Sequence, residues 1–364
     1  MNKDILNVMV TGVGGGGVGE QIMKALRLSD NRYYIVGGDM QKNSRGFKLA
    51  DVAYILPGAR NPEYIPTLLK ICKKHDIKVL FYGSEPELKV FSENRDIFEQ
   101  NDIIVPLNPR EVIELCMDKN KTMEWLKERG FAFPKSFMVK NKNDLDKVDF
   151  LPAVLKPSIG GGGSVNTFIA QTEDELEMFG TFLLKMYDEF IIQEYVGDYE
   201  NEYTVGVMCD YKTGEYVNSI AVKKSIMSGL SNKMRIPNYS ENKALGDYLV
   251  ISNGVSQGEI GKFPIVTEQC KEIAVALGVR GPINIQCRLV KDKVHVFEIN
   301  PRISGTTSLR ALVGYNEPEM LIRSTVLDEK VTVDFPYKSG YIARGLDETL
   351  LDSAFMENIE SSNL

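Results

Sequence analysis

Polar side chains form a row across two neighbouring segments in the last third of the chain, and this row limits the fold more than any other feature. Residues 281–289 and 294–300 alternate between apolar and polar side chains, with a turn expected near Asp292. Because successive side chains of a strand point to opposite faces, the first segment has an apolar and a polar face. The apolar face holds Ile283, Ile285, Cys287 and Leu289, and the polar face holds Asn284, Gln286 and Arg288. The pattern predicts an antiparallel hairpin with one face in the core.

The polar face of this hairpin is a candidate metal site. With a turn about residue 292, Gln286 lies opposite Glu298, and Asn284 lies opposite Asn300. Cross-strand neighbours are ~5 Å apart and same-face neighbours ~6.6 Å apart, so Gln286, Glu298 and Asn300 can converge on one or two divalent cations. Their oxygens are hard donors, which suit a Mg²⁺ ion whose shell is completed by phosphate oxygens. The alternative is a half-exposed hairpin whose polar face meets only water.

The second strand of the hairpin ends in Asn300-Pro301-Arg302. Proline breaks the strand directly after the oxygen-bearing pair, and the next residue brings a permanent positive charge beside the proposed metal. A guanidinium can bind a phosphoryl group through two parallel hydrogen bonds. Arg302 is therefore a candidate catalytic residue.

Two lysines and a second glycine loop form a candidate phosphate site. Lys119 opens a helical segment that runs to Arg129, and Lys156 ends an apolar strand just before the loop 158–164. Four consecutive glycines allow this loop to bring its amides over a polyphosphate and to open again, although the spacing is not that of a P-loop. A lysine in an apolar strand is costly unless it faces a partner, so a phosphate-binding role and a plain structural explanation both stay open for Lys156. Lys119 by itself is better explained as a solvated charge.

The first 110 residues alternate between short strands and helices, which predicts a parallel, doubly wound sheet. Its first turn carries Gly12, Gly14 and Gly17, and Asp39 follows about 20 residues later, as in the dinucleotide fingerprint. An NAD(P)-dependent oxidoreductase is therefore one alternative. The run 14–17 is unbroken glycine, however, so the match is partly inevitable, and a helix N-terminus attracts any anion. Glycines that only allow close helix–strand packing explain the pattern equally well.

Composition excludes several other classes of protein. The 364 residues correspond to two or three domains at roughly 150 residues each. Lys and Arg number 43 against 50 Asp and Glu, and the net charge of −7 argues against a nucleic-acid partner. Five scattered cysteines and two histidines leave little material for a zinc site or a catalytic triad. No apolar stretch is long enough for a signal peptide or a membrane span, so we expect a cytoplasmic protein without a membrane partner.

Two segments have weak patterns. Residues 225–262 are polar and dotted with glycine, and we expect loops and a mobile segment there. The last dozen residues resemble a poorly ordered tail.

Taken in chain order, these motifs resemble the ATP-grasp superfamily. They are Asp118-Lys119, Val154-Leu155-Lys156-Pro157-Ser158 with its glycine loop, Gln193-Glu194-Tyr195-Val196, Glu202-Tyr203, Asn284-x-Gln286 and Glu298-Ile299-Asn300-Pro301-Arg302. The resemblance covers about residues 5–325 and is closest in character to the synthetase half of the carbamoyl-phosphate synthase large subunit. It implies an α/β fold, α+β in its C-terminal part. A Rossmann-like pre-ATP-grasp domain (1–113) would precede an ATP-grasp lid subdomain (114–192) and a C-terminal subdomain with the metal site (193–364).

The resemblance also implies roles for single residues. Lys119 and Lys156 would contact the phosphates of ATP, and a loop containing Ser158, Gly161, Gly162, Gly163 and Ser164 would close over them. Gln193, Glu194, Tyr195 and Val196 would present backbone groups to adenine, and Glu202 would bind the ribose hydroxyls. Gln286, Glu298 and Asn300 would hold one or two Mg²⁺ ions, with Mn²⁺ as an alternative ion. Arg302 would steady the transferred phosphoryl group.

Lysine at positions 119 and 156 resembles the carboxylate–amine ligases of the superfamily, because carbamoyl-phosphate synthases usually have arginine there. The leading hypothesis is an ATP-dependent ligase that joins a small-molecule acid to an amine through an acyl phosphate. Carboxyphosphate or carbamoyl-phosphate chemistry, the oxidoreductase and a non-catalytic ATP-binding module stay open as alternatives. The sequence identifies neither substrate, and a homodimer is an expectation from the family only. Candidates for reading the acceptor carboxylate are Lys223, Lys224, Lys233, Arg235 and Arg310.

Overall fold

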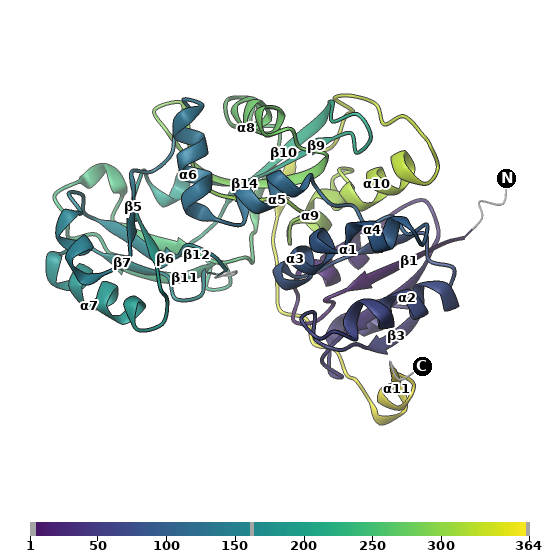
Figure 1. The fold of residues 1–364 in the computed structure, drawn as a ribbon. Helices are drawn as coiled ribbons and strands as arrows, with labels where there is room; N and C mark the ends of the chain where they lie inside the picture. Colours follow the sequence, from purple (N-terminus) through teal and green to yellow (C-terminus); the bar gives the residue numbers. More distant parts are fainter. Residues whose placement is uncertain (1–4, 161–163, 362–364) are drawn as a thin grey trace.

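The computed structural model describes residues 5–160 and 164–361, and four β-sheets organise this part of the chain (Figure 1). A parallel sheet and its helices form the N-terminal part. An antiparallel sheet of six strands lies beside it, and a small four-stranded sheet with a two-stranded ribbon lies at the far end (Figure 1). This mixed architecture confirms the predicted fold class.

The N-terminal sheet has the strand order β17-β3-β2-β1-β4, and all its pairings are parallel. Its strands are β1 (Leu6–Thr11), β2 (Tyr33–Asp39), β3 (Val52–Ile55), β4 (Val79–Phe81) and β17 (Glu360–Ser361). The helices beside it are α1 (Val18–Arg27), α2 (Tyr64–Lys74), α3 (Glu85–Glu93) and α4 (Arg95–Glu99). A Cβ atom at Gly19 would lie 2.5 Å from the carbonyl oxygens of Thr11 and Gly12, so close packing of α1 on β1 requires glycine there.

The six-stranded sheet is antiparallel, in the order β15-β14-β9-β10-β13-β16. Its strands are β9 (Glu202–Cys209), β10 (Tyr216–Lys224), β13 (Gly258–Gly261), β14 (Gly281–Val290), β15 (Lys293–Asn300) and β16 (Gly340–Ile342). Helices near it are α5 (Arg110–Cys116), α6 (Lys119–Glu128), α8 (Pro264–Leu277), α9 (Thr307–Leu312) and α10 (Glu317–Thr325). The apolar face of β14, with Ile283, Ile285 and Cys287, lies in a core shared with α8, as the alternation predicts.

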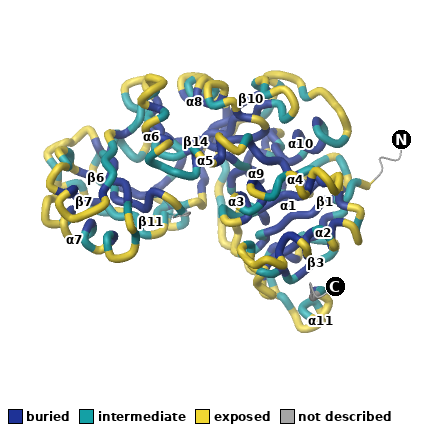
Figure 2. The backbone as a smooth tube through the Cα atoms, in the orientation of Figure 1, coloured by how far each residue is buried: buried dark blue, intermediate teal, exposed yellow. Residues whose placement is uncertain are grey.

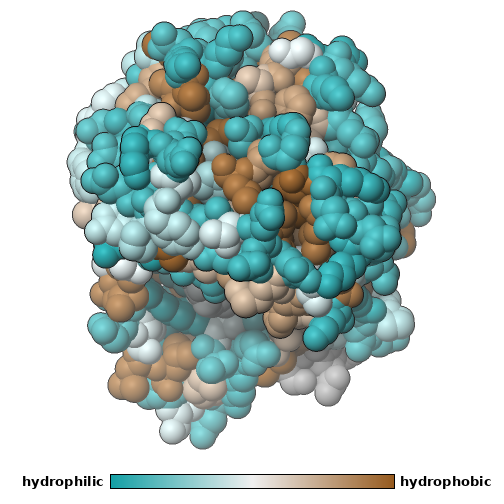
Figure 3. Space-filling view, turned by 90° about the vertical axis from the view of Figure 1, so that its left-hand side faces the viewer, coloured by the Kyte–Doolittle hydropathy of each residue, from teal (hydrophilic) through white to brown (hydrophobic). Residues whose placement is uncertain are grey.

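The four-stranded sheet has the order β5-β8-β6-β7, with antiparallel pairings. Its strands are β5 (Ser136–Val139), β6 (Ala153–Pro157), β7 (Phe168–Ala170) and β8 (Phe190–Glu194), and α7 (Glu173–Leu184) packs against them. Thr172 caps α7 by accepting a hydrogen bond from the Glu175 backbone, as the capping pattern predicts. Figure 3 turns this end of the molecule toward the viewer and shows apolar side chains gathered among hydrophilic ones.

Two weak-pattern segments are more regular than expected. Residues 225–262 contain β11 (Asn232–Pro237), β12 (Tyr248–Ser252) and β13, so the expectation of loops there is wrong. Leu249 and Ile251 of β12 are buried, and their core supplies the stabilisation that the polar flanks do not reveal. The tail expectation is also wrong for its described part, because residues 353–361 contain α11 (Ser353–Glu357) and β17.

Burial follows the sheets, and the exposed backbone lies on outer loops and on the segment that leads to α11 (Figure 2). Short 3-10 helices lie at Arg45–Leu49, Lys142–Lys147, Tyr199–Asn201 and Lys243–Leu245. None of the helices in the described ranges is long and apolar enough to cross a membrane. The boundaries 113/114 and 192/193 stay a proposal: the second falls within β8, and β17 returns to the N-terminal sheet.

Candidate active site

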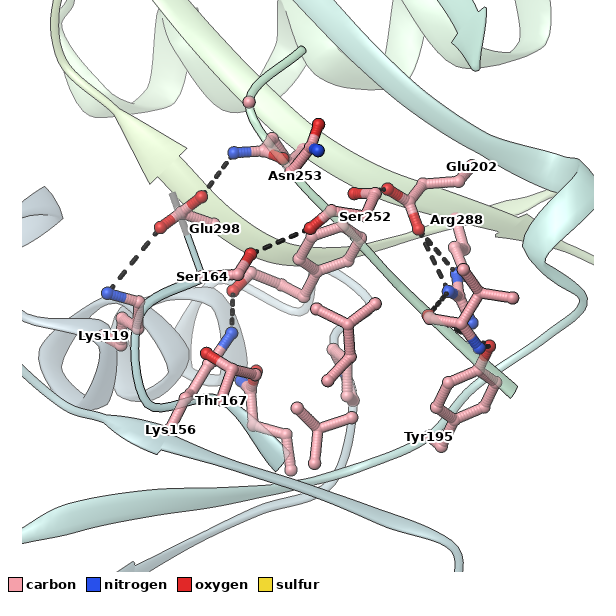
Figure 4. A pocket seen from close by; sticks show the side chains of 18 of the residues that line it. Lys119, Lys156, Ser164, Thr167, Tyr195, Glu202, Ser252, Asn253, Arg288 and Glu298 are labelled. Carbon is pink, nitrogen blue, oxygen red and sulfur yellow. Dashed lines mark hydrogen bonds and ion pairs between the residues drawn. The ribbon is translucent and has the colours of Figure 1, made fainter. Parts of the chain in front are cut away.

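A deep cavity lies between the four-stranded sheet, the β11–β12 ribbon and the six-stranded sheet (Figure 4). It contains about 1040 Å³ that no protein atom fills, including solvent space at its mouth. Most of the predicted site residues line it: Lys119, Lys156, Ser164, Gln193, Glu194, Tyr195, Val196, Glu202, Gln286, Glu298, Asn300 and Arg302. Ser158 is not among the lining residues, and Gly161, Gly162 and Gly163 lie outside the described residues. The fold thus brings together residues that are up to 183 positions apart, from Lys119 to Arg302.

The two lysines point into one end of this cavity beside Glu298 (Figure 4). Lys119 Nζ donates to the Gly160 carbonyl at 3.1 Å and lies 3.6 Å from Glu298 Oε1. Lys156 Nζ donates to the Phe297 carbonyl at 3.1 Å and is 9% exposed. Burial, and next the charge of Lys119, lower the pKa of Lys156 to about 7. This end of the cavity therefore holds excess positive charge that an anion would relieve.

The predicted hairpin positions Glu298, but its strands pair through a bulge that the simple alternation did not predict. The turn is a two-residue loop at Lys291 and Asp292, both with positive φ, between the paired residues Val290 and Lys293. An unbroken ladder from that turn would pair Gln286 with Phe297. A bulge between Gln286 and Cys287 skips Phe297, so that Gln286 pairs with Glu298 and Asn284 with Asn300, as predicted.

Glu298 supplies the negative charge at the end of the cavity where Lys119 and Lys156 lie. Burial would raise its pKa, but the positive charges of Lys119, Lys156 and Arg302 outweigh that effect and hold the pKa below its ordinary value. The side chain is 24% exposed, and Gln286 Nε2 donates to its Oε2. Asn300 Oδ1 accepts from Arg302 Nη2 at 3.0 Å.

The donor set fits a hard cation that is completed by ligand oxygens. No group of three or more His, Cys, Asp or Glu side chains in the described ranges could hold a metal by itself. Mg²⁺ is usually bound by one or two protein oxygens together with phosphates and water. Glu298 and Asn300 offer such oxygens, whereas the oxygen of Gln286 faces Lys224 at 3.3 Å. Asn300 Oδ1 also accepts from a cation, but that cation, Arg302, itself lines the cavity, whereas the oxygen of Gln286 faces the buried Lys224.

A second cluster includes Glu202, Ser252 and Arg288, which lie away from Lys119 toward the opposite end of the cavity (Figure 4). Lys224 joins this cluster through Glu202 and Ser252. Arg288 donates to Glu202 Oε2 from Nε at 3.1 Å and from Nη2 at 3.0 Å. Lys224 Nζ, at 3.0 Å, and Ser252 both donate to Oε1. Burial raises the pKa of Glu202, but Lys224 and Arg288 more than offset it, and the pKa lies below its ordinary value. Both oxygens of this predicted ribose ligand are therefore engaged by the protein.

The segment predicted to meet adenine, residues 193–196, is anchored through the side chain of Tyr195. The Tyr195 hydroxyl donates to the Val250 carbonyl at 3.3 Å and accepts from the Val250 amide at 2.7 Å. Arg288 lies 4.4 Å from the centre of the Tyr195 ring and donates to the Val196 carbonyl at 3.3 Å. The backbone is held as well, because the Glu194 and Tyr195 amides donate to the Lys135 and Pro152 carbonyls at 2.8 and 2.9 Å.

Two of the cationic side chains expected to read the acceptor carboxylate are too deeply buried for that role. Arg310 is fully buried and pairs with Glu317 at 2.8 Å, and Lys224 is buried beneath the cavity, so neither can read an acceptor carboxylate. Sequence reasoning gave Arg288 no role in the site and gave Lys224 a different one, whereas the structure places both on Glu202. Arg288 belongs to the polar row of the hairpin, and Lys224 ends the β10 strand, but their partners come from β9 and β12.

In the N-terminal part, Asp39 is part of the glycine turn. Its Oδ2 accepts from the Gly14 amide at 2.8 Å, and a Cβ at Gly14 would lie 3.1 Å from that oxygen. The acid of the dinucleotide fingerprint therefore stabilises the turn in this structure.

Comparisons with known proteins agree with this fold. Residues 10–106 match the family described as the PylC-like N-terminal domain, and residues 252–346 match the family described as ATP-grasp in the biosynthetic pathway with Ter operon. The carbamoyl phosphate synthase large chain of Thermoplasma volcanium is 22% identical over 327 residues, covering 84% of this chain and 29% of the relative. That of Hyperthermus butylicus is 24% identical over 334 residues, with the same coverage. The chain spans less than a third of the length of these relatives.

Solved structures show the same architecture. N5-carboxyaminoimidazole ribonucleotide synthetase (PurK) in complex with ADP gives a TM-score of 0.64 at 15% identity, covering 93% of this chain and 82% of that one. The Thermotoga maritima enzyme of the same name gives 0.58 at 19% identity, covering 92% and 79%. D-alanine–D-alanine ligase from Bacillus anthracis gives 0.55 at 18% identity, covering 90% and 98%. The chain thus has an ATP-grasp fold, and its relatives and structural neighbours are ATP-grasp ligases.

Proposed function

We propose that this chain is an ATP-dependent carboxylate–amine ligase that forms an amide and releases ADP and phosphate. One observation carries the proposal: Lys119, Lys156 and Arg302 converge on the half-buried Glu298 at one end of a nucleotide-sized cavity. Such an arrangement suits a metal-bound triphosphate, because cations and a carboxylate together balance the charges of phosphate and metal.

In the first step, an oxygen of the substrate carboxylate bonds to the γ-phosphorus of ATP, and the bond to the bridging oxygen breaks, releasing ADP. Lys119, Lys156 and Arg302 would hold the phosphoryl oxygens and offset their charge as the bonds change. Glu298 and Asn300 would hold Mg²⁺, which when bound neutralises further phosphate charge. Lys156 must be protonated to contribute.

In the second step, the amine attacks the carbonyl carbon of the acyl phosphate. The carbon–oxygen bond to phosphate breaks, inorganic phosphate leaves, and the nitrogen loses a proton to solvent. Water would hydrolyse the acyl phosphate, so the site must also exclude water until the amine has reacted. Closure of loop 158–164 is the proposed means, with Ser164 already bonded to the Ser252 carbonyl at 2.8 Å.

Carboxyphosphate chemistry is the second candidate. The resemblance to carbamoyl phosphate synthases favours it, and one structural neighbour is a biotin carboxylase domain in complex with MgADP and bicarbonate. In this case bicarbonate takes the place of the organic acid, and the same residues hold the nucleotide. Bicarbonate-dependent release of ADP without an organic acid would favour this candidate over the first.

The test is a screen of carboxylic acids, with bicarbonate among them, against amines, in which ADP release and product mass are measured. We expect one acid–amine pair to give an amide, and Glu298→Gln to lower its turnover roughly a hundredfold or more. The control is Glu268→Gln, which removes an exposed partner of Lys271 on α8 and should leave turnover unchanged. Turnover in Glu298→Gln within a few-fold of the parent would contradict the assignment.

A further inference from the structure

Lys224 lies beneath the cavity and contacts three residues that line it. Its Nζ donates to Glu202 Oε1 at 3.0 Å, to Ser252 Oγ at 3.0 Å and to Gln286 Oε1 at 3.3 Å. The side chain is 3% exposed, and Lys224 is not itself a lining residue. An ammonium group has three N–H donors and no acceptor, so these three contacts use its whole capacity.

Lys224 also decides the orientation of the Gln286 amide. Because a lysine can only donate, the Gln286 atom that faces it must be the oxygen. The amide nitrogen is then left to face Glu298, and Gln286 Nε2 donates to Glu298 Oε2. Gln286 therefore holds one oxygen of Glu298 and leaves Oε1 on the side of Lys119.

These contacts form an unbroken hydrogen-bonded chain between the two ends of the cavity. It runs from Glu202 through Lys224 and Gln286 to Glu298. Each link joins a charged group to its neighbour, and hydrogen bonds in series polarise one another in a buried setting. The chain thus connects the carboxylate at one end of the cavity with the carboxylate at the other.

We propose that Lys224 is a positioning residue that couples ribose binding at Glu202 to metal binding at Glu298. This inference rests on the proposed function, which assigns the nucleotide and the metal to those two carboxylates. A ribose hydroxyl that donates to Glu202 competes with Lys224 for the carboxylate. Lys224 then moves its hydrogen bonding toward Gln286, its most distant partner of the three, and Gln286 holds Glu298 more firmly in the orientation that presents Oε1 to a metal.

The test measures the coupling directly by calorimetry. Dissociation constants are determined for ADP and for 2′,3′-dideoxy-ADP, each with and without Mg²⁺. The coupling is the gain in affinity that Mg²⁺ gives ADP, divided by the gain it gives the dideoxy nucleotide. We expect a coupling on the order of fivefold in the parent, within the range of couplings between binding sites, and about one in Lys224→Met.

Two further variants separate positioning from a structural role. Gln286→Leu breaks the chain at its next link but keeps the Lys224–Glu202 pair, so its coupling should also fall to about one, and it keeps the proposal testable if Lys224→Met does not fold. Lys262→Met removes a lysine from an exposed pair with Asp334, 3.2 Å apart, and should keep the parent coupling. A lysine that only supports the fold would weaken all four affinities alike and leave the ratio unchanged.

The outcomes distinguish the inference from its premise. A parent coupling of one, or an undiminished coupling in Lys224→Met and Gln286→Leu, overturns the role of Lys224 while ADP binding stands. Failure of the parent to bind ADP with Mg²⁺ overturns the proposed function, and the proposed role of Lys224 is then overturned as well.

Discussion

Lys156 has an unusual charge state for a lysine. It is 9% exposed, lies near Lys119, and has its pKa lowered to about 7, burial being the largest cause. Glu298 and Glu202 oppose this shift but do not cancel it. A phosphate placed beside Lys156 would favour its charged form, so the bound nucleotide should raise this pKa again.

Nucleotide binding should therefore take up a proton above neutral pH. At pH 8 Lys156 is mostly neutral in the free protein and protonated in the complex, so ADP binding consumes close to one proton. Affinity should then fall roughly tenfold for each pH unit above 7, until the pKa of the complex is reached. Calorimetry in two buffers with different heats of ionisation measures the uptake.

Lys156→Met is the matched variant, since it keeps the length of the side chain and removes the titrating group. It should bind ADP more weakly and without proton uptake. Equal uptake in the variant and the parent would show that another group titrates.

The α9 and α10 helices carry a buried ion pair against the six-stranded sheet. Arg310 and Glu317 are 0% and 1% exposed, and their side chains approach to 2.8 Å. Arg310 Nη2 also donates to Asn284 Oδ1 at 2.7 Å, which explains why Asn284, in the polar row of β14, is not free to bind a metal. A Cβ at Gly206 would lie 2.4 Å from Arg310 Nη1, so β9 needs glycine where the guanidinium crosses it.

Removing one member of this pair should be strongly destabilising. Arg310→Met leaves Glu317 buried without its partner, and we expect the free energy of unfolding to fall by about 3–5 kcal/mol in urea titrations. Arg310→Met with Glu317→Leu removes both charges and should regain most of the loss. A single variant as stable as the parent, or a double variant no better than the single, would contradict this account.

Among the strands and helices, the sequence predicted the β14–β15 hairpin and its paired residues, but not the bulge that brings them into register. Two-residue alternation is visible in 281–300, because each strand carries its own pattern. The bulge that skips Phe297 is not visible, since it depends on packing across the strands. For the same reason the sequence makes Lys224 only a candidate for the acceptor carboxylate and places Arg288 only in the polar row: their partner Glu202 belongs to β9, and neither local segment reveals that contact.

In the whole molecule, the C-terminal segment joins the two larger sheets. β16 extends the six-stranded sheet beside β13, and β17 extends the N-terminal sheet beside β3. Between them Asp347 pairs with Arg45 at 2.9 Å, and Lys48 lies 3.9 Å from the ring centre of Phe355. The sequence could not reveal this return, because strands of three and two residues and single side-chain pairs leave no periodic pattern.

The same arrangement makes the cavity a product of the whole chain. Its walls come from three sheets, and its charged ends come from segments that the sequence separates widely. The motifs in the sequence predicted most of the residues at the Lys119 end, since each motif is a short contiguous segment, but only Glu202 of the cluster at the other end. The convergence of these motifs on one cavity depends on how the sheets pack, which no single motif reveals.

A crystal structure of the chain with ADP and Mn²⁺ tests the central claim most directly, because the anomalous signal of manganese locates the metal. We expect adenine beside residues 194–196, phosphates within hydrogen-bond distance of Lys119 and Lys156, and the metal on Glu298 and Asn300. A nucleotide bound outside this cavity, or manganese away from both of those side chains, would contradict the account.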